Sequence, residues 1–203
     1  QSISVKSRVS GFFSNLIQGL LLVALASLLV LGRGPSFVVV MAIPISIFIA
    51  IGWVDFAGFA LQQMSIVGLV IALGLLVDNA IVVAENVLRY RRQGLGPKEA
   101  AEKGSSEVGM AIVSGTLTTV LSFVPMLIMQ NGSGSFIRSM PVTVVLTLLA
   151  SLLIALTLTP LLSSMMKKNV VKETKMQKRL DSLAENQYTN ALDWALTRPK
   201  RIL

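Results

Sequence analysis

The segment GLLVDNAIVVAENVL, residues 74 to 88, holds two polar side chains in the middle of an otherwise apolar run. The carboxyl of Asp78 can gain and lose a proton, whereas the amide of Asn79 donates and accepts hydrogen bonds but does not titrate. In a helix, Gly74 precedes Asp78 by about one turn, and Glu85 follows it on nearly the same side. This pattern favours proton transfer at Asp78, with Gly74, Asn79 and Glu85 in supporting or packing roles.

The composition limits the chemistry that these residues can take part in. The chain has no His and no Cys, which excludes disulfides, thiolate or imidazole metal sites and a Ser-His-Asp triad within it. Acid-base work therefore falls to carboxylates, Lys or Tyr. We expect no metal and no cofactor, only a proton gradient.

The elements that must position Asp78 are membrane-spanning helices. Of the 203 residues, 53% are hydrophobic and 14% are charged, and the mean hydropathy is +0.73, which is typical of a membrane protein. A span needs about 20 mostly apolar residues, and an α-helix satisfies its own backbone in lipid. The sequence therefore predicts an all-α membrane protein with a five-helix transmembrane bundle over residues 11–166. The predicted spans are roughly 11–31, 36–54, 64–88, 108–129 and 140–162.

The basic residues predict the orientation of this bundle. If the loops alternate between the two sides, 15 of the 18 Lys and Arg residues fall on one side, and Lys6, Arg8 and Arg138 fall on the other. The positive-inside rule makes the first side cytoplasmic. Residues 1–10 become an extracytoplasmic lead-in, and we expect further spans before and after these five. The placement of the Lys and Arg residues thus explains the net charge of +8 as a signal of membrane orientation. Nucleic acid is therefore not an expected partner.

Two segments outside the spans are predicted to be helical. QGLGPKEAAEKGSSE has a helix start at Pro97, Glu99 in the first turn and Gly104 after the end, which predicts a short cytoplasmic helix. Within residues 167–203, apolar side chains gather near one helical face. This predicts a cytoplasmic amphipathic helix on the inner membrane surface that leads toward a further span, with a solvated linker helix as the alternative.

A carboxyl at the depth of Asp78 has two possible roles. It costs roughly 2.5 to 3.5 kcal/mol to insert, so it should face protein or trapped water. The first role is a proton relay, in which the change of charge biases helix packing. The second is a permanently protonated structural acid. Asn79 is expected to join helices, Glu85 to form a proton exit or a polar helix end, and Gly68 and Gly74 to admit a neighbouring helix.

Residues 68 to 126 also resemble a known family. They combine G-x-x-x-D-x-A-I-V-V-x-E-N, a G-x-x-x-x-E-A connector and S-F-V-P in order. This stretch is similar to the fourth and fifth transmembrane helices of resistance-nodulation-division (RND) exporters of the drug and amphiphile type. The flanking spans resemble the second, third and sixth helices, so the resemblance covers nearly the whole chain.

The resemblance implies a proton-driven antiporter, not an enzyme, that exports drugs or other amphiphiles across a bacterial inner membrane. It maps the proton-relay acid of the family onto Asp78. Many drug exporters have a second Asp where this chain has Asn79, so Asp78 is expected to titrate alone. The implied partners are the lipid bilayer, a second repeat of the exporter, further copies in a homotrimer and, in Gram-negative bacteria, a periplasmic adaptor and an outer-membrane channel.

Two other functions were weighed. Sterol-sensing domains are also five-helix units and resemble part of the same superfamily, so a lipid- or sterol-sensing module without proton coupling is the main alternative. An intramembrane aspartyl protease needs two catalytic acids on neighbouring helices. Apart from Glu85 on the same helix, the other acids lie in predicted loops, and the pattern GLLVD differs from the GxGD that such proteases resemble.

Overall fold

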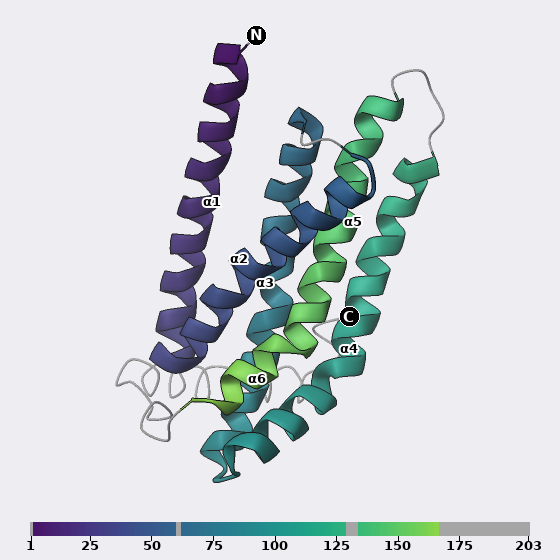
Figure 1. Ribbon diagram of the computed structural model, residues 1–203. Helices are drawn as coiled ribbons and strands as arrows, with labels where there is room; N and C mark the ends of the chain where they lie inside the picture. The colour runs from purple at the N-terminus through teal and green to yellow at the C-terminus, as the bar shows by residue number, and fades with distance from the viewer. Residues whose placement is uncertain (1, 60–61, 129–133, 167–203) are drawn as a thin grey trace, which may run out of the picture.

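The computed structural model describes residues 2–59, 62–128 and 134–166, which form six helices (Figure 1). No strand occurs in these ranges, which confirms the predicted all-α fold. The amphipathic helix predicted within residues 167–203 lies outside the described residues. The helices are α1 (Ser2–Leu31), α2 (Arg33–Phe56), α3 (Gln63–Arg92), α4 (Pro97–Ile128), α5 (Gly134–Leu156) and α6 (Leu158–Ser164).

Four segments of the described chain are long and apolar enough to cross a membrane. A shorter apolar segment, Ile17–Leu29, lies in α1, which already begins at Ser2 and thus includes most of the predicted lead-in. The long helices run along one another as a bundle, with α2 crossing obliquely in front of α3 (Figure 1). The four segments are Gly34–Phe56, Met64–Arg92, Pro97–Ile128 and Arg138–Ser164.

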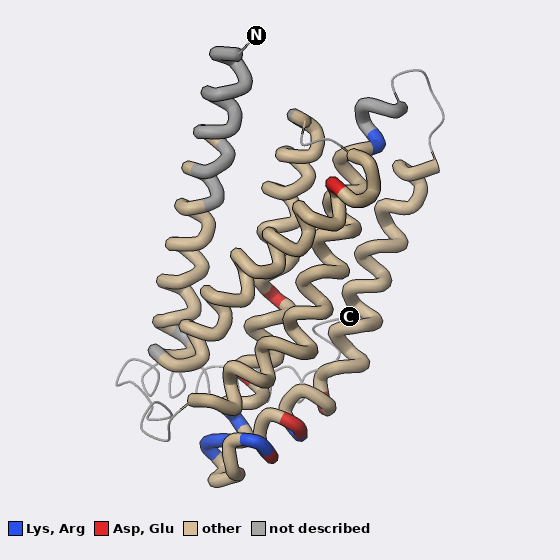
Figure 2. Tube along the Cα trace, viewed as in Figure 1, with Lys and Arg blue, Asp and Glu red and all other residues tan. Residues whose placement is uncertain are grey.

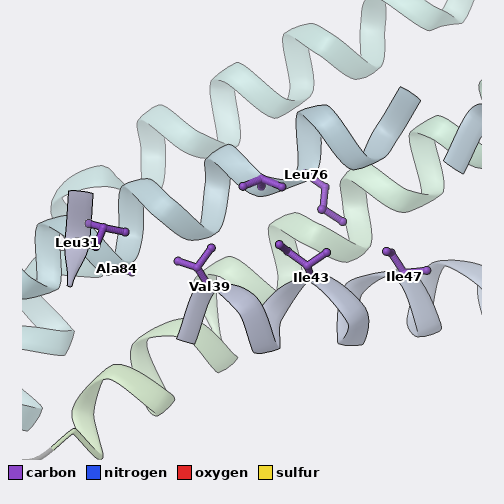
Figure 3. Packing of buried hydrophobic residues seen from close by; sticks show 7 residues of the cluster. Leu31, Val39, Ile43, Ile47, Leu76 and Ala84 are labelled. Carbon is purple, nitrogen blue, oxygen red and sulfur yellow. The ribbon is translucent and has the colours of Figure 1, made fainter. Parts of the chain in front are cut away.

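The helix that carries Asp78, α3, contacts all five other helices, and its largest interface is with α5. Between α1, α2 and α3, large aliphatic side chains fill a core in which Ile43 and Leu76 are almost fully buried (Figure 3). Removing these side chains from solvent and packing them closely holds α3 in place. The position of Asp78 is therefore set by the packed faces of its own helix.

The interface between α3 and α5 is held by close backbone approach and buried hydroxyls. A Cβ built on Gly68 would lie 2.7 Å from the carbonyl oxygen of Met140, so a side chain is excluded there. Half-way along the interface, the buried hydroxyl of Ser151 donates a hydrogen bond of 2.8 Å to the carbonyl of Leu76. Gly68 thus admits a neighbouring helix as the sequence predicted.

One helix replaces the two elements expected between Pro97 and residue 129. The prediction that Gly104 ends a short helix is wrong, because α4 runs unbroken from Pro97 to Ile128. Gly104 is instead a contact residue, since a Cβ there would lie 2.8 Å from both Cα and N of Val87 in α3. Glycine signals a helix end and a close helix crossing equally well, and only tertiary contacts distinguish the two.

The last predicted span is interrupted close to Pro160. Proline has no N–H and its ring clashes with the carbonyl four residues earlier, which here belongs to Leu156. Accordingly α5 ends at Leu156, and α6 begins at Leu158. The hydroxyl of Thr159 donates to the carbonyl of Ile154 at 3.2 Å and satisfies one acceptor near the break.

Charged residues lie mostly at one end of the bundle, and an acidic residue also lies in the middle of α3 (Figure 2). One end holds the C-terminus of α3, the N-terminus of α4 and the connection between them. We call this end the basic end. It is defined by Arg89, Arg91, Arg92, Lys98 and Lys103.

Candidate functional site

The side chain of Asp78 is exposed on a face of α3 that the described helices leave partly uncovered. The same face carries other partly exposed apolar side chains, including Leu75 (39% exposed) and Val82 (42% exposed). These residues are three or four positions apart and therefore share one side of the helix. Gly74 adds to this open side, because a Cβ built there meets nothing within 4 Å. Of the two predicted contact glycines, only Gly68 contacts a described helix.

Asp78 lines an open cleft of about 380 Å³. The opposite wall is α4, which contributes Gly115, Thr116 and Thr119, and Leu148 of α5 closes one side. The hydroxyl of Thr119 already donates to the carbonyl of Gly115 at 3.0 Å, as membrane hydroxyls commonly do. The cleft thus places the Asp78 carboxyl on the same surface as the Thr119 hydroxyl, which bonds to the backbone of its own helix.

The amide of Asn79 joins α3 to α4. Its Nδ2 donates to Oγ1 of Thr116 at 3.3 Å, and the Thr116 hydroxyl lies 3.5 Å from Oδ1 of Asn79. Asn79 is rotated about 100° from Asp78 around the helix, but both residues line the cleft. The two neighbouring polar residues therefore share one cleft, and Asn79 is bonded to the α4 wall of that cleft.

No described Lys or Arg lines the cleft that contains Asp78. The nearest basic side chain in sequence, that of Arg89, lies at the basic end, about three helical turns away. A charged carboxylate is stabilised by a nearby cation or by water. Within the described residues, only the open mouth of the cleft offers either.

A second open cleft, of about 430 Å³, lies at the basic end. Glu85, Arg89 and Arg92 of α3 give it both signs of charge, and Leu31 of α1 and Val108 of α4 form apolar parts of its wall. Glu85 is exposed, and it belongs to this cleft and not to the one that holds Asp78. The structure therefore separates the two acids of the motif into neighbouring clefts.

A polar cluster next to this cleft ties α3 to α4, and sequence reasoning did not find it. The buried Asn86 donates to the carbonyl of Gly104 at 2.8 Å and to Glu107 at 2.9 Å. Arg89 forms an ion pair with the same Glu107 at 3.0 Å and also lies over the ring of Tyr90. The sequence motif does contain Asn86, but its hydrogen-bond partners on α4 depend on how α4 crosses α3 at Gly104.

The described residues contain no group of three or more His, Cys, Asp or Glu that could hold a metal ion. The acids on α3 are separated by two helical turns, and Glu107 is paired with Arg89. The arrangement suits exchange of protons between carboxyls and water, and it gives a metal too few ligands.

Comparison with known proteins gives concordant matches. The sequence profile of the AcrB/AcrD/AcrF family matches residues 1–203. Multidrug resistance protein MdtC of Pectobacterium carotovorum is 31% identical over 208 residues, and that of Escherichia coli O139:H28 is 32% identical over 209, each covering 100% of this chain. MdtC of Salmonella arizonae is 34% identical over 166 residues, which cover 80% of this chain and 16% of the relative. The chain spans about 20% of the length of the first two relatives.

Proposed function

Because the chain belongs to the AcrB/AcrD/AcrF family, we propose that it is the membrane part of the first repeat of a proton-driven exporter of drugs or other amphiphiles. The predicted relationship to RND exporters is confirmed by the match over the whole chain and by the MdtC relatives. In this proposal the protein is a secondary active transporter. Its cargo crosses elsewhere in the exporter, and this part couples the transport to proton flow.

The observation that carries the proposal is the surroundings of Asp78. Its carboxyl is the acidic side chain of an open cleft part-way along a membrane-spanning helix, and no described cation lines that cleft. An acid within a membrane span is a functional residue by default, and the open cleft leaves this carboxyl accessible. Its protonation state then depends on which side of the membrane supplies the water, as a relay requires.

The open face of α3 supports an assembly larger than this bundle. A charge on Asp78 can alter the packing of elements that lie against this face, and the described helices cover the face only in part, where α4 and Leu148 line the cleft. We assign the face to the second repeat of the exporter. The complete pump is proposed to be a homotrimer in the lipid bilayer, with an adaptor and an outer-membrane channel in a Gram-negative cell.

The remaining residues of the motif take supporting roles in this proposal. Asn79 holds α4 beside Asp78 through its hydrogen bond with Thr116. Gly74 has no side chain on the open face of α3, so a neighbouring helix can approach closely there. The basic end faces the cytoplasm, because a multi-pass protein of the inner membrane keeps its Lys- and Arg-rich loops there. The N-terminal end of the chain is then extracytoplasmic, and the C-terminal end is cytoplasmic.

The experiment compares Asp78→Asn with Asp55→Asn in the full-length exporter, reconstituted in vesicles that carry a proton gradient. The amide keeps the shape of the side chain and removes the titration. We expect Asp78→Asn to abolish proton-coupled transport while expression and assembly remain normal. Asp55 is exposed at the end of α2 and lines neither cleft, so its variant should transport normally.

Gradient-dependent transport that persists in Asp78→Asn would refute the relay. A lipid-sensing module makes a different prediction for the same vesicles. Its response would follow the lipid or sterol composition and would not change when the proton gradient is removed.

A further inference from the structure

The two clefts on α3 share one residue, Val82. One cleft contains Asp78, and the other, at the basic end, contains Glu85. Val82 follows Asp78 by four residues and precedes Glu85 by three, so all three side chains lie on one side of the helix. The two clefts are therefore consecutive parts of one groove along α3, and they meet at an apolar side chain.

The opposite wall of the groove is also continuous. Successive turns of α4 contribute Val108 to the cleft at the basic end and Ala111 and Ile112 to the cleft of Asp78. These side chains carry no hydrogen-bonding group, and they lie at the level of Val82 because α3 and α4 run side by side in opposite directions (Figure 1). Water is held poorly where every wall is apolar. The groove thus has polar ends and a short apolar stretch between them.

The distances fit a proton path with one interruption. At 1.5 Å per residue, Asp78 and Glu85 are about 10 Å apart along the helix axis, which is too far for direct transfer. Hydrogen bonds of about 2.8 Å mean that roughly three water molecules would join the two carboxyls. That chain of water must pass Val82, whose side chain is 42% exposed in the groove.

We propose that Glu85 receives the proton that Asp78 releases toward the basic end, and that Val82 is the barrier that the water chain must pass. This rests on the proposed function of Asp78. The carboxylic acid of Asp78 gives its proton to the adjacent water and becomes a carboxylate. The proton moves along the water chain to the carboxylate of Glu85, which then gives it to solvent at the basic end. No other reactant is needed.

Apart from Asp78, the charged groups that line the groove lie at its Glu85 end. Toward Asp78, α4 and α5 present Gly115, Thr116, Thr119 and Leu148 but no described titratable group. Around Glu85, α3 itself presents the cationic side chains of Arg89 and Arg92, which line the same cleft. From α4, the acid Glu107 is already paired with Arg89 and bonded to Asn86, so it competes little for the proton.

The test follows the Asp78 carboxyl in the full-length exporter by time-resolved infrared spectroscopy after a pH jump on the side of the basic end. A positioned proton acceptor contributes about 10²-fold to a transfer rate, so Glu85→Gln should slow the deprotonation of Asp78 by about that factor. Val82→Phe should slow it as well, and Val82→Ser should accelerate it because the apolar stretch then offers water a hydrogen-bonding group. The matched control is Val67→Phe, since Val67 is 39% exposed on the same helix and lines neither cleft.

An unchanged rate in Glu85→Gln overturns the role of Glu85. An unchanged rate in both Val82 variants, each assembling like the wild type, overturns the barrier. Either result leaves the relay at Asp78 intact, because that proposal fails on a separate measurement, the retention of coupled transport in Asp78→Asn. If Val82→Phe does not assemble, the smaller Val82→Ser and the Glu85 variant still decide the question.

Discussion

A methyl group added at Gly104 tests whether the α3–α4 crossing is as close as the structure indicates. The added Cβ would lie 2.8 Å from Cα and N of Val87 and 2.9 Å from its Cγ2. Non-bonded carbons pack at about 3.5 to 4.0 Å, so α3 and α4 would have to separate by about 1 Å. The two nearest atoms belong to the backbone of α3 and cannot turn aside as the end of a side chain can.

The two effects of Gly104→Ala have opposite signs, and the clash should dominate. Overpacking costs about 1 to 3 kcal/mol, and the upper end applies here because backbone must move. Replacing Gly by Ala inside a helix returns about 1 kcal/mol. The expected net destabilisation is therefore about 2 kcal/mol, and separation of the helices would also weaken the bond from Asn86 to the Gly104 carbonyl.

Gly109→Ala is the matched control on the same helix. Its added Cβ would lie 3.8 Å from Cδ2 of Leu156, an ordinary contact, so only the gain in helix propensity remains. Thermal unfolding of both purified variants should show opposite shifts, a lower midpoint for Gly104→Ala and an equal or higher midpoint for Gly109→Ala. Equal midpoints for the two variants would refute the close crossing.

Two further substitutions test the contacts of α3. Ser151→Ala removes the buried hydrogen bond to the Leu76 carbonyl and should destabilise the protein by about 1 kcal/mol, measured by thermal unfolding. Asn79→Asp sets a second acid beside Asp78 and can still accept the Thr116 hydroxyl; because neighbouring acids titrate together, the pH dependence of transport should shift while assembly is retained.

Each of these substitutions has a result that contradicts its premise. For Ser151→Ala the control is Ser106→Ala, since the hydroxyl of Ser106 is exposed and bonds only within its own helix. If both variants unfold at the same temperature, the Ser151 bond contributes nothing. For Asn79→Asp, loss of assembly would show that the amide itself is needed at the α3–α4 contact, and an unchanged pH profile would show that the two positions are not coupled.

The sequence predicted the features that depend on each helix alone. Apolar runs of membrane length follow from the residues themselves, and so does the face shared by Asp78 and Glu85. The close approach at Gly68 was also predicted, because small residues in apolar helices commonly mark contacts.

Features that depend on how two helices meet were not predicted. The contact of Asn86 with Glu107 requires the register between α3 and α4, which Gly104 sets by its crossing with Val87. The same glycine was assigned to a helix end, since the local sequence cannot distinguish the two uses. The groove past Val82 likewise exists only because α4 lies beside α3 at that register.

The two sides of α3 differ in a way that bears on how a charge change would act. Toward α5 the helix is tightly packed, with Ala72 fully buried and the Gly68 contact leaving no room for a side chain. Toward α4, near Asp78, the described contact is the Asn79–Thr116 hydrogen bond beside an open cleft. Close-packed interfaces resist displacement, so α3 and α5 should move together as one unit. Protonation of Asp78 would then act on whatever lies on the open face and on the part of α4 that lines the cleft.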